Sequence, residues 1–384
     1  MTGPAPRLVI ACPNYAPALG GGAVYYRALA EGLAARGRVG RIEVLTEAHP
    51  GEPAATTSQD GALVVRRCWP YRSAHPGRQR DRHLRYAREQ AGLAALAGRD
   101  WPPGSVLLVH GSFHLHPGLL PAALRLLARR RRRPALVADL RDPLIPAARL
   151  ARTLRPYDAV IACGAAVSRH LAQAPEVAAK AWDIPVLFAA PPPPSDAEAA
   201  TTARALGLIP GRYVLWTGGL LWRKNLAPAL AAVRRLRATA PEVVLAVAGR
   251  CRERDARSAA AEAEGTLKLL GPQPHAAMPA LARAAGVVVN TARIEGLPRA
   301  GLEALAAGAR VLLPPDVPEF ARHCPDHLAE TEDPARLAAQ IARALDGALP
   351  APTYPLAAHA PETVLPRYEA LLANLECDAI QLDR

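Results

Sequence analysis

Short apolar runs, separated by stretches rich in Ala, Leu and Arg, recur along the chain and limit the folds open to it. In the first half, such strand-like runs occupy residues 8–12, 42–46, 63–67, 106–110, 135–139 and 159–163. Several of the stretches between them have helical character, as at residues 23–36. Strands that alternate with helices form mostly parallel, doubly wound sheets. We therefore expect an α/β fold.

A polyproline segment divides this pattern into two halves. Residues 189–196 read AAPPPPSD, a stiff stretch that cannot lie inside a domain element. Beyond it the alternation starts again, with apolar runs at residues 213–217, 243–248, 267–270, 287–290 and 311–313. We predict an N-terminal domain over 1–190, a C-terminal domain over 197–350 and a last amphipathic helix within 361–378 that packs back on the N-terminal domain. Two such domains would hold a ligand in the crevice between them.

Composition narrows the class of protein. The 384 residues suffice for two domains, and half of them are apolar. The formal net charge is +13, but Lys occurs only three times, so the charge reflects a bias toward Arg more than an anionic partner. Six scattered cysteines form no C-x-x-C motif, which argues against a zinc site and a disulfide framework. Without a signal-peptide pattern or an apolar run of about 18 residues, the chain is expected in the cytoplasm.

Two glutamates eight positions apart, Glu295 and Glu303, give the strongest indication of function. A Gly-Leu-Pro turn separates the first from a helix that carries the second; Pro298 suits the first turn of that helix, and Gly308 ends it. The start of such a helix presents backbone N–H groups and a partial positive charge to a ligand. Carboxylates beside an anion site suit a ligand with phosphate and vicinal hydroxyls, because one carboxylate can accept from two neighbouring hydroxyls.

Two cations follow the first strand of the C-terminal half. Arg223 and Lys224 come after the Gly218-Gly219 turn, just before a helix. An ammonium here would neutralise the charge of an anionic ligand, or charge that develops on a leaving group. Arg223 would share this task through a bidentate grip. The alternative is a solvated pair of loop charges.

The N-terminal half adds candidates at the ends of its expected strands. A Gly triplet at residues 20–22 opens a helix and would let backbone N–H groups approach an anion closely. His110 ends one strand, and Arg141 and Asp142 follow the next. The carboxyl ends of parallel strands face the ligand crevice of such sheets.

No metal site is predicted. His114 and His116 follow His110 closely, but no matching shell of Asp, Glu or Cys lies nearby in the sequence. The D-x-D motif does not occur in the chain either, which argues against an enzyme that holds a divalent metal through such a motif.

The C-terminal half resembles the donor half of the retaining glycosyltransferases of family 4. The resemblance lies in an ordered series of motifs: YVLWTGGLLWRKNL, VLAVAGR, LKLLGPQPHAAMPALARAAGVVVNTARIEGLPRAGLEALAAGARVLLP and DVPEF. It is strong over about residues 210–320 and looser over 8–37 and 105–171, and the Glu-x7-Glu signature is intact at Glu295 and Glu303. It implies the GT-B fold, two Rossmann-like domains facing across a cleft. It also implies transfer of a sugar from a nucleotide diphosphate donor, with retention of configuration and without metal or other cofactor.

The resemblance also implies roles for individual residues. Lys224, Arg223 and Glu295 would be catalytic, with Glu295 at the donor sugar and Glu303 at the ribose. The donor-binding set would comprise Gly21, Gly22, Gly218, Gly296, Leu297, Pro298 and Glu303. The acceptor side would comprise His110, Arg141 and Asp142. Gly219 stands where many members carry Arg, so phosphate binding would depend more on Arg223 and Lys224.

Two basic segments are candidate sites for contact with an anionic partner. Residues 71–88 carry six Arg, where members that act on lipid-linked acceptors dock to an anionic membrane, and residues 129–133 are five consecutive Arg. The alternative for both is a solvated face. A nucleic-acid partner is not expected, because no nucleic-acid-binding module is present and few aromatics interleave with the Arg residues. The acceptor would be a glycan, a lipid-linked sugar or a small natural product, with peripheral membrane contact left open.

Two other functions remain open at this point. The same fold would serve a nucleotide-sugar epimerase, or a non-catalytic relative that binds a membrane or a partner. The sequence names neither the sugar and nucleotide nor the acceptor.

Overall fold

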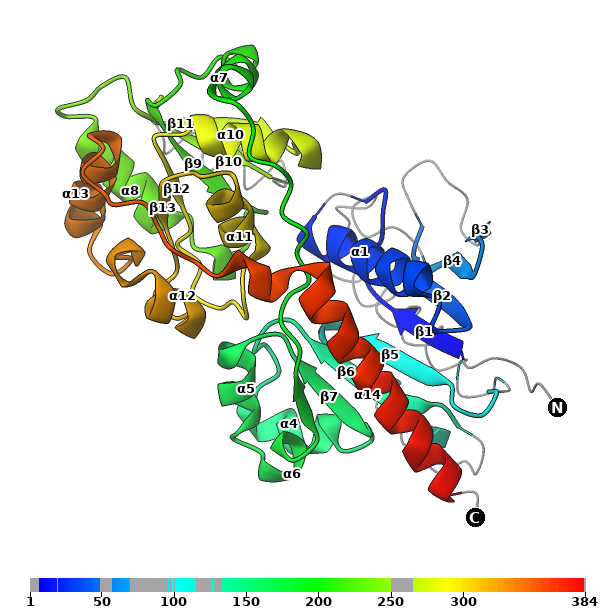
Figure 1. Cartoon of the computed structure of the whole chain (residues 1–384). Coiled ribbons are helices and arrows are strands. Elements are labelled where there is room, and N and C mark those ends of the chain that lie inside the picture. Colours follow the sequence, from blue (N-terminus) through cyan, green and yellow to red (C-terminus); the bar gives the residue numbers. More distant parts are fainter. Residues whose placement is uncertain are drawn as a thin grey trace. The chain divides into compact units, whose positions relative to one another are not determined.

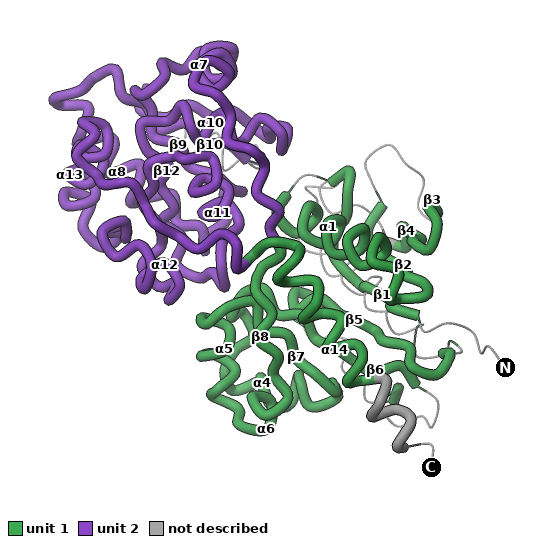
Figure 2. Tube along the Cα trace, viewed as in Figure 1, with its two compact units in different colours: residues 1–187, 359–384 green, residues 188–358 purple. Residues whose placement is uncertain are grey.

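The structure, a computed structural model, describes residues 7–18, 20–48, 57–69, 96, 99, 101–114, 126–127, 133–249 and 265–382. Its chain forms two compact units, shown in different colours in Figure 2. Unit 1 comprises Met1–Leu187 and His359–Arg384, and unit 2 comprises Phe188–Ala358. No helix among these described residues is long and apolar enough to cross a membrane.

Unit 1 is built on an eight-stranded sheet with the order β3-β4-β2-β1-β5-β6-β7-β8. Its strands are β1 (Arg7–Ala11), β2 (Arg41–Glu47), β3 (Thr57–Asp60), β4 (Leu63–Trp69), β5 (Val106–His110), β6 (Ala135–Leu140), β7 (Ala159–Ala162) and β8 (Ala181–Asp183). All neighbouring strands are parallel except β3 and β4. The inner strands are mostly apolar, as strands buried on both faces usually are, although β2 also buries Glu43 and β6 buries Asp139.

The helices of unit 1 include one from the far end of the chain. They are α1 (Gly21–Arg36), α4 (Ala147–Leu154), α5 (Ala165–Leu171), α6 (Pro175–Ala178) and α14 (Pro361–Leu382), with the 3₁₀ turn η2 (Gly111–His114). Helices α1 and α14 lie side by side (Figure 1). Glu369 of α14 accepts hydrogen bonds from Arg36 of α1 at 2.6 and 3.1 Å, and the buried hydroxyls of Tyr25 and Tyr368 bond to each other. The helix predicted at 361–378 is therefore part of the first unit.

Unit 2 has a smaller, wholly parallel sheet with the order β11-β10-β9-β12-β13. Its strands are β9 (Tyr213–Thr217), β10 (Val244–Ala248), β11 (Leu267–Gly271), β12 (Val287–Val289) and β13 (Val311–Leu312). Its helices are α7 (Asp196–Ala205), α8 (Ala227–Leu236), α10 (Met278–Ala284), α11 (Arg299–Ala306), α12 (Pro318–His323) and α13 (Pro334–Leu345). Short 3₁₀ turns are η3 (Trp222–Lys224), η4 (His275–Ala277), η5 (Pro325–His327) and η6 (Leu356–His359).

The core of unit 2 forms between its sheet and two helices. Trp216 of β9 and Leu245 of β10 pack in one buried cluster with Val233 of α8 and Ile341 of α13. These side chains are at most 1 % exposed. A rigid sheet of this kind fixes the positions of the loops that leave its carboxyl edge, and those loops carry the predicted site.

Candidate active site

Three glycines lie at the carboxyl ends of neighbouring strands of the unit 2 sheet. Gly218 follows β9, Gly249 follows β10 and Gly271 ends β11, with φ angles of 133°, 157° and 69°. A Cβ on Gly249 would lie 1.9 Å from the carbonyl oxygen of Gly218, so the two backbones are in direct contact. The N–H of Gly218 donates to Ala248, and the N–H of Gly249 donates to Gly271, each at 2.9 Å. Only glycine fits this close approach.

The loop after β9 is tied to the loop after β12. The N–H of Arg293 donates to the carbonyl of Arg223 at 2.9 Å, and the hydroxyl of Thr291 donates to the carbonyl of Asn225 at 2.5 Å. Asn225 takes the left-handed conformation, with a φ of 52°, which ends the η3 turn. The bonds bring Lys224, at the end of η3, beside the segment that carries Glu295.

Glu295 is the centre of a charged cluster. Its side chain is 6 % exposed and forms an ion pair with the ammonium of Lys224, while Nη1 of Arg223 lies 3.6 Å from its Oε1. The aliphatic part of Lys224 lies over Gly218, where a Cβ would be 3.8 Å from its Cδ and Cε. A buried carboxylate needs charged or hydrogen-bonding partners. The structure thus brings together the three residues that the sequence predicts to be catalytic.

Glu303 has an arginine and a histidine as neighbours. It lies on α11, where Nη2 of Arg299 donates to its Oε1 at 3.3 Å, and Nδ1 of His275 lies 3.9 Å away. Neither Arg299 nor His275 is predicted from the motifs. The spacing of Arg299 and Glu303, four residues apart on one helix, was the available signal for that pair.

The turn before α11 differs in one detail from the prediction. Pro298 is the N-cap, one residue before the helix, instead of lying within its first turn, and Gly308 ends the helix with a φ of 70°. Gly296, Leu297 and Pro298 are buried. The side chains of Leu297 and Pro298 therefore pack in the interior, and a ligand would meet this turn through its backbone.

The Gly triplet of unit 1 lies at the start of α1. Gly20 is the N-cap, with a φ of 132°, and Gly21 is the first helical residue. A Cβ on Gly22 would lie 3.1 Å from Oδ1 of Asn14, so the loop after β1 packs closely on the helix start. Gly20, Gly21 and Gly22 are all exposed, so the N-terminal N–H groups of this helix are open to a ligand.

His110 and Arg141 lie at the carboxyl ends of the adjacent strands β5 and β6. Nδ1 of His110 hydrogen-bonds with Oγ of Ser112 at 2.6 Å. Arg141 donates to Oδ1 of Asp139 at 3.2 Å and to the hydroxyl of Tyr25 at 3.0 Å, and its guanidinium lies 3.8 Å above the ring of Tyr25.

Asp139 completes this network. It is fully buried and also accepts from the hydroxyl of Tyr26 at 2.7 Å. The network ties β6 to α1 and α14 and gives Arg141 a packing role within unit 1. Asp142, the next predicted residue, is half-buried at the same edge.

His114 is a core residue. It is buried and shares a 2.5 Å hydrogen bond between its Nε2 and the hydroxyl of Tyr157. Burial, with smaller effects of His110 and Arg149, lowers the pKa of His114 to about 4. The imidazole is therefore neutral near pH 7. His116 lies outside the described residues.

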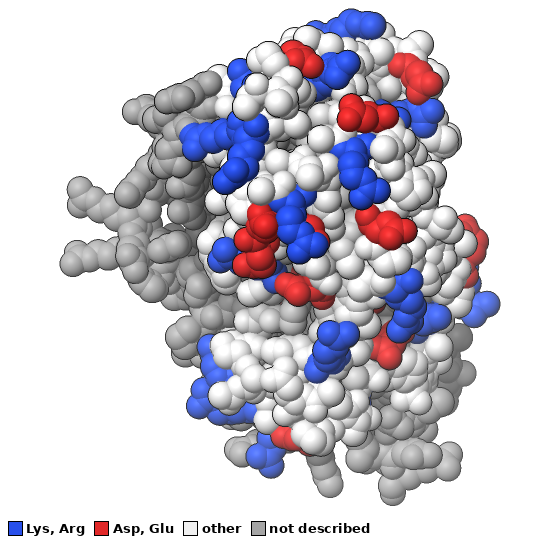
Figure 3. All heavy atoms as spheres, turned by 90° about the vertical axis from the view of Figure 1, so that its left-hand side faces the viewer, with Lys and Arg blue, Asp and Glu red and all other residues white. Residues whose placement is uncertain are grey.

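Of the two basic segments, only Arg133 is among the described residues. Residues 71–88 and 129–132 lie outside the described residues, and Arg133 forms a bidentate ion pair with Asp158 at 2.5 and 2.7 Å. On the face of the molecule in Figure 3, Lys and Arg lie among Asp and Glu instead of gathering into a patch of one sign.

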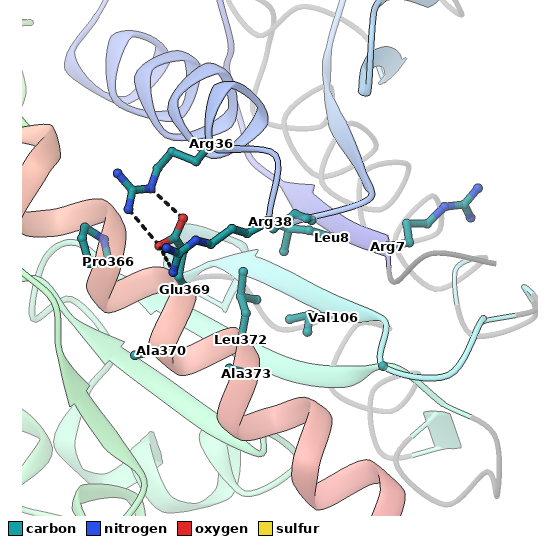
Figure 4. A pocket seen from close by; sticks show the side chains of 12 residues that line it. Arg7, Leu8, Arg36, Arg38, Val106, Pro366, Glu369, Ala370, Leu372 and Ala373 are labelled. Carbon is teal, nitrogen blue, oxygen red and sulfur yellow. Dashed lines mark hydrogen bonds and ion pairs between the residues drawn. The ribbon is translucent and has the colours of Figure 1, made fainter. Parts of the chain in front are cut away.

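A hollow in unit 1 lies away from these residues. Leu8 and Val106, at the amino ends of β1 and β5, line it together with Leu372 of α14. Figure 4 shows Arg36 and Arg38 pointing toward Glu369 at its rim. Because it opens at the amino ends of the strands, it is separate from the sites at the carboxyl edge.

Comparison with known proteins supports a glycosyltransferase. Residues 211–347 match the family model described as "Glycosyl transferases group 1". This segment contains Arg223, Lys224, Glu295, Arg299 and Glu303, so the whole charged cluster lies in the part that is similar to that family. A search of curated protein sequences found no match to the chain.

Solved structures resemble the whole chain. The alpha,alpha-trehalose 6-phosphate synthase of Burkholderia multivorans is 18% identical, with a TM-score of 0.69 and 99% of each chain covered. The sucrose-phosphate synthase of Thermosynechococcus elongatus is 17% identical, with a TM-score of 0.68 and coverage of 99% of this chain and 98% of its own. An E. coli structure described as bound with UDP-2-fluoro glucose is 15% identical, with a TM-score of 0.62 and coverage of 98% and 99%. These likenesses confirm the GT-B fold, while membership of family 4 stays a prediction.

Proposed function

We propose that this protein is a retaining glycosyltransferase that moves a sugar from a nucleotide-diphosphate sugar to an acceptor hydroxyl without a metal ion. The observation that carries the proposal is the contact of Glu295 with Arg223 and Lys224, inside the segment similar to group 1 glycosyltransferases. One carboxylate held between two cations suits a ligand in which a sugar adjoins a diphosphate.

The charges of the cluster favour such a donor. Arg223, Lys224 and Arg299 face the two carboxylates of Glu295 and Glu303, which leaves one net positive charge. A diphosphate would draw the ammonium of Lys224 away from Glu295. The freed carboxylate would then accept hydrogen bonds from hydroxyls of the donor sugar, and Glu303 would accept from the ribose.

The proposed reaction needs no enzymic nucleophile. The bond between the anomeric carbon and the diphosphate oxygen breaks, and the acceptor oxygen bonds to the same face of that carbon. The acceptor proton passes to an oxygen of the leaving diphosphate. Lys224 and Arg223 stabilise the charge that develops on the diphosphate. Unit 1 would present the acceptor, with His110 and Asp142 as its contacts.

A panel of nucleotide sugars, followed by thermal shift and by release of nucleoside diphosphate, tests this proposal. At a hundredfold excess over Kd, the right donor should add about 2.7 kcal/mol of stability. Lys224→Ala and Glu295→Gln should each lower transfer at least about a hundredfold, as loss of a charge-stabilising group does. Both proteins should keep their fold.

Lys268→Ala is the matched control. Lys268 lies on β11 in the same unit, and its ammonium donates to the carbonyl of Gly207 at 2.8 Å. This variant should transfer sugar at the normal rate. Normal transfer by Lys224→Ala and Glu295→Gln, or no response to any nucleotide sugar, would overturn the proposal.

A further inference from the structure

Trp222 is the most exposed large apolar side chain among the described residues. It is 72 % exposed, and its neighbour Leu221 is 47 % exposed. The other two exposed large apolar side chains in the described ranges, Leu126 and Ile209, stand singly. Single exposed apolar residues are common, whereas an adjacent pair that includes Trp beside a charged site calls for an explanation.

Trp222 begins a turn whose backbone is held by hydrogen bonds. The carbonyl of Trp222 accepts from the N–H of Asn225 at 3.3 Å, and the carbonyl of Leu221 accepts from the N–H of Lys224 at 2.9 Å. The left-handed Asn225 and its hydrogen bond from Thr291 anchor the end of the turn. The backbone of the turn is therefore held in place while the indole is exposed to solvent, so a ligand can cover it without reordering the backbone.

The turn places Trp222 next to the predicted chemistry. Trp222 and Lys224 are the two ends of η3, and a 3₁₀ turn rises only about 2 Å per residue. The ammonium at one end contacts Glu295. In the proposed reaction the acceptor oxygen must reach the anomeric carbon beside this ammonium, so the reacting end of the acceptor lies within one short turn of Trp222.

We propose that Trp222 binds the acceptor by stacking its indole on a sugar ring, an inference that rests on the proposed function. One face of a sugar ring carries C–H groups that are attracted to the electron-rich face of an aromatic ring. The hydroxyls on the rim of the same ring suit the flanking Arg223 and Lys224. Trp supplies a large and rigid contact area, which is why it is frequent among residues that dominate binding.

A sugar ring fits this surface better than a lipid chain does. The exposed apolar surface here consists of Trp222 and Leu221, and cations follow it directly in the sequence. A lipid chain would need a longer apolar groove. Ile209, the other exposed large apolar residue described in unit 2, precedes β9 and so lies toward the opposite, amino edge of the sheet.

Kinetics with the wild-type protein and the donor found in the nucleotide-sugar panel test the inference. The acceptor probes are free hexoses, glucose 6-phosphate and octyl glucoside. Trp222→Ala should raise the acceptor KM about tenfold, within the range measured for stacking on aromatic side chains, and should leave donor hydrolysis without acceptor unchanged. Trp222→Phe should restore most of the affinity, and Ile209→Ala, the matched control, should change nothing.

Other results would overturn either the role of Trp222 alone or the proposed function as well. An unchanged acceptor KM, equal loss of donor hydrolysis, or an effect confined to octyl glucoside would overturn the inference while leaving the proposed function standing. The same holds if the wild type hydrolyses a donor but transfers to none of the sugars. If no nucleotide sugar is turned over at all, the proposed function itself fails, and the role of Trp222 fails with it.

Discussion

Glu295 is a buried carboxylate whose surroundings are dominated by positive charge. Its side chain is 6 % exposed and contacts two cations, Lys224 and Arg223. Removing one partner of such a buried pair leaves an uncompensated charge, while removing the carboxylate leaves two cations close together. In the proposed function, the diphosphate of the donor would take the place of the carboxylate beside the two cations, and the sugar hydroxyls would take the place of the cations beside the carboxylate.

His114 gives a pH prediction that does not depend on the enzymatic proposal. Burial is the main cause that lowers its pKa from 6.5 in the unfolded chain to about 4 in the folded protein. The unfolded state binds the proton more readily, so the contribution of His114 to stability is present above pH 6.5 and is lost as the pH falls toward 4. We expect up to about 3 kcal/mol of stability to be lost over this window through this residue.

Chemical denaturation at pH 7 and pH 4.5 measures this effect. His114→Gln keeps a side chain that can hydrogen-bond to Tyr157 but does not titrate, so its stability should fall less than that of the wild type. Equal losses in the two proteins would show that His114 does not contribute to the pH dependence.

At the scale of elements, the contact between the loops after β9 and β10 supports the site. Gly249→Ala forces a Cβ to within 1.9 Å of the Gly218 carbonyl oxygen, at a φ of 157°. The backbone under Lys224 must then shift. We expect a loss of about 2–4 kcal/mol in stability and weaker donor binding, since strain and overpacking add.

Gly211→Ala separates the effect of a positive φ from the effect of crowding against Gly218. Gly211 also has a positive φ, 75°, but its Cβ would meet nothing within 4 Å. This variant should lose only about 1 kcal/mol and keep normal donor binding, both measured by thermal denaturation with and without donor. If both substitutions cost the same, crowding against Gly218 is not important.

The strands of the two sheets were predictable where a strand is a continuous apolar run. The runs VLAVA in β10 and VVV in β12 are of this kind, because strands of a parallel sheet are buried on both faces. The edge strands β3, with the sequence TSQD, and β8, with AWD, were not predicted. Their few residues carry no apolar pattern, and pairing with β4 and β7 determines their structure.

The candidate site was likewise predictable where local motifs determine it, and not where contacts between distant residues do. The order of motifs along the chain placed Arg223, Lys224 and Glu295 in one site before any contact was known. The packing role of Arg141 could not be predicted, because its partner Tyr25 is 116 positions away in the sequence. Contacts of that kind depend on how α1 and α14 pack against β6, and no local pattern records them.

At the scale of the whole molecule, the chain leaves unit 1, builds unit 2 and returns to unit 1 with α14. Tyr368 on this helix is 1 % exposed and bonds to the hydroxyl of Tyr25. Tyr368→Ala should therefore destabilise unit 1 by about 3–5 kcal/mol, the usual cost of truncating a buried aromatic side chain. Unit 2 should be unaffected.

Calorimetry that resolves two transitions checks this prediction. Asn374→Ala, an exposed position on the same helix, should move neither transition. A shift of both transitions in Tyr368→Ala would mean that the two units unfold as one.

The configuration of the sugar in the product shows directly whether transfer proceeds with retention. The wild-type protein would be incubated with its nucleotide sugar, an acceptor and a chelator, and the new glycosidic bond examined by ¹H NMR. We expect a product with the same anomeric configuration as the donor, formed at the same rate with or without chelator and lost in Lys224→Ala. A product of inverted configuration, or transfer that the chelator abolishes, would contradict it.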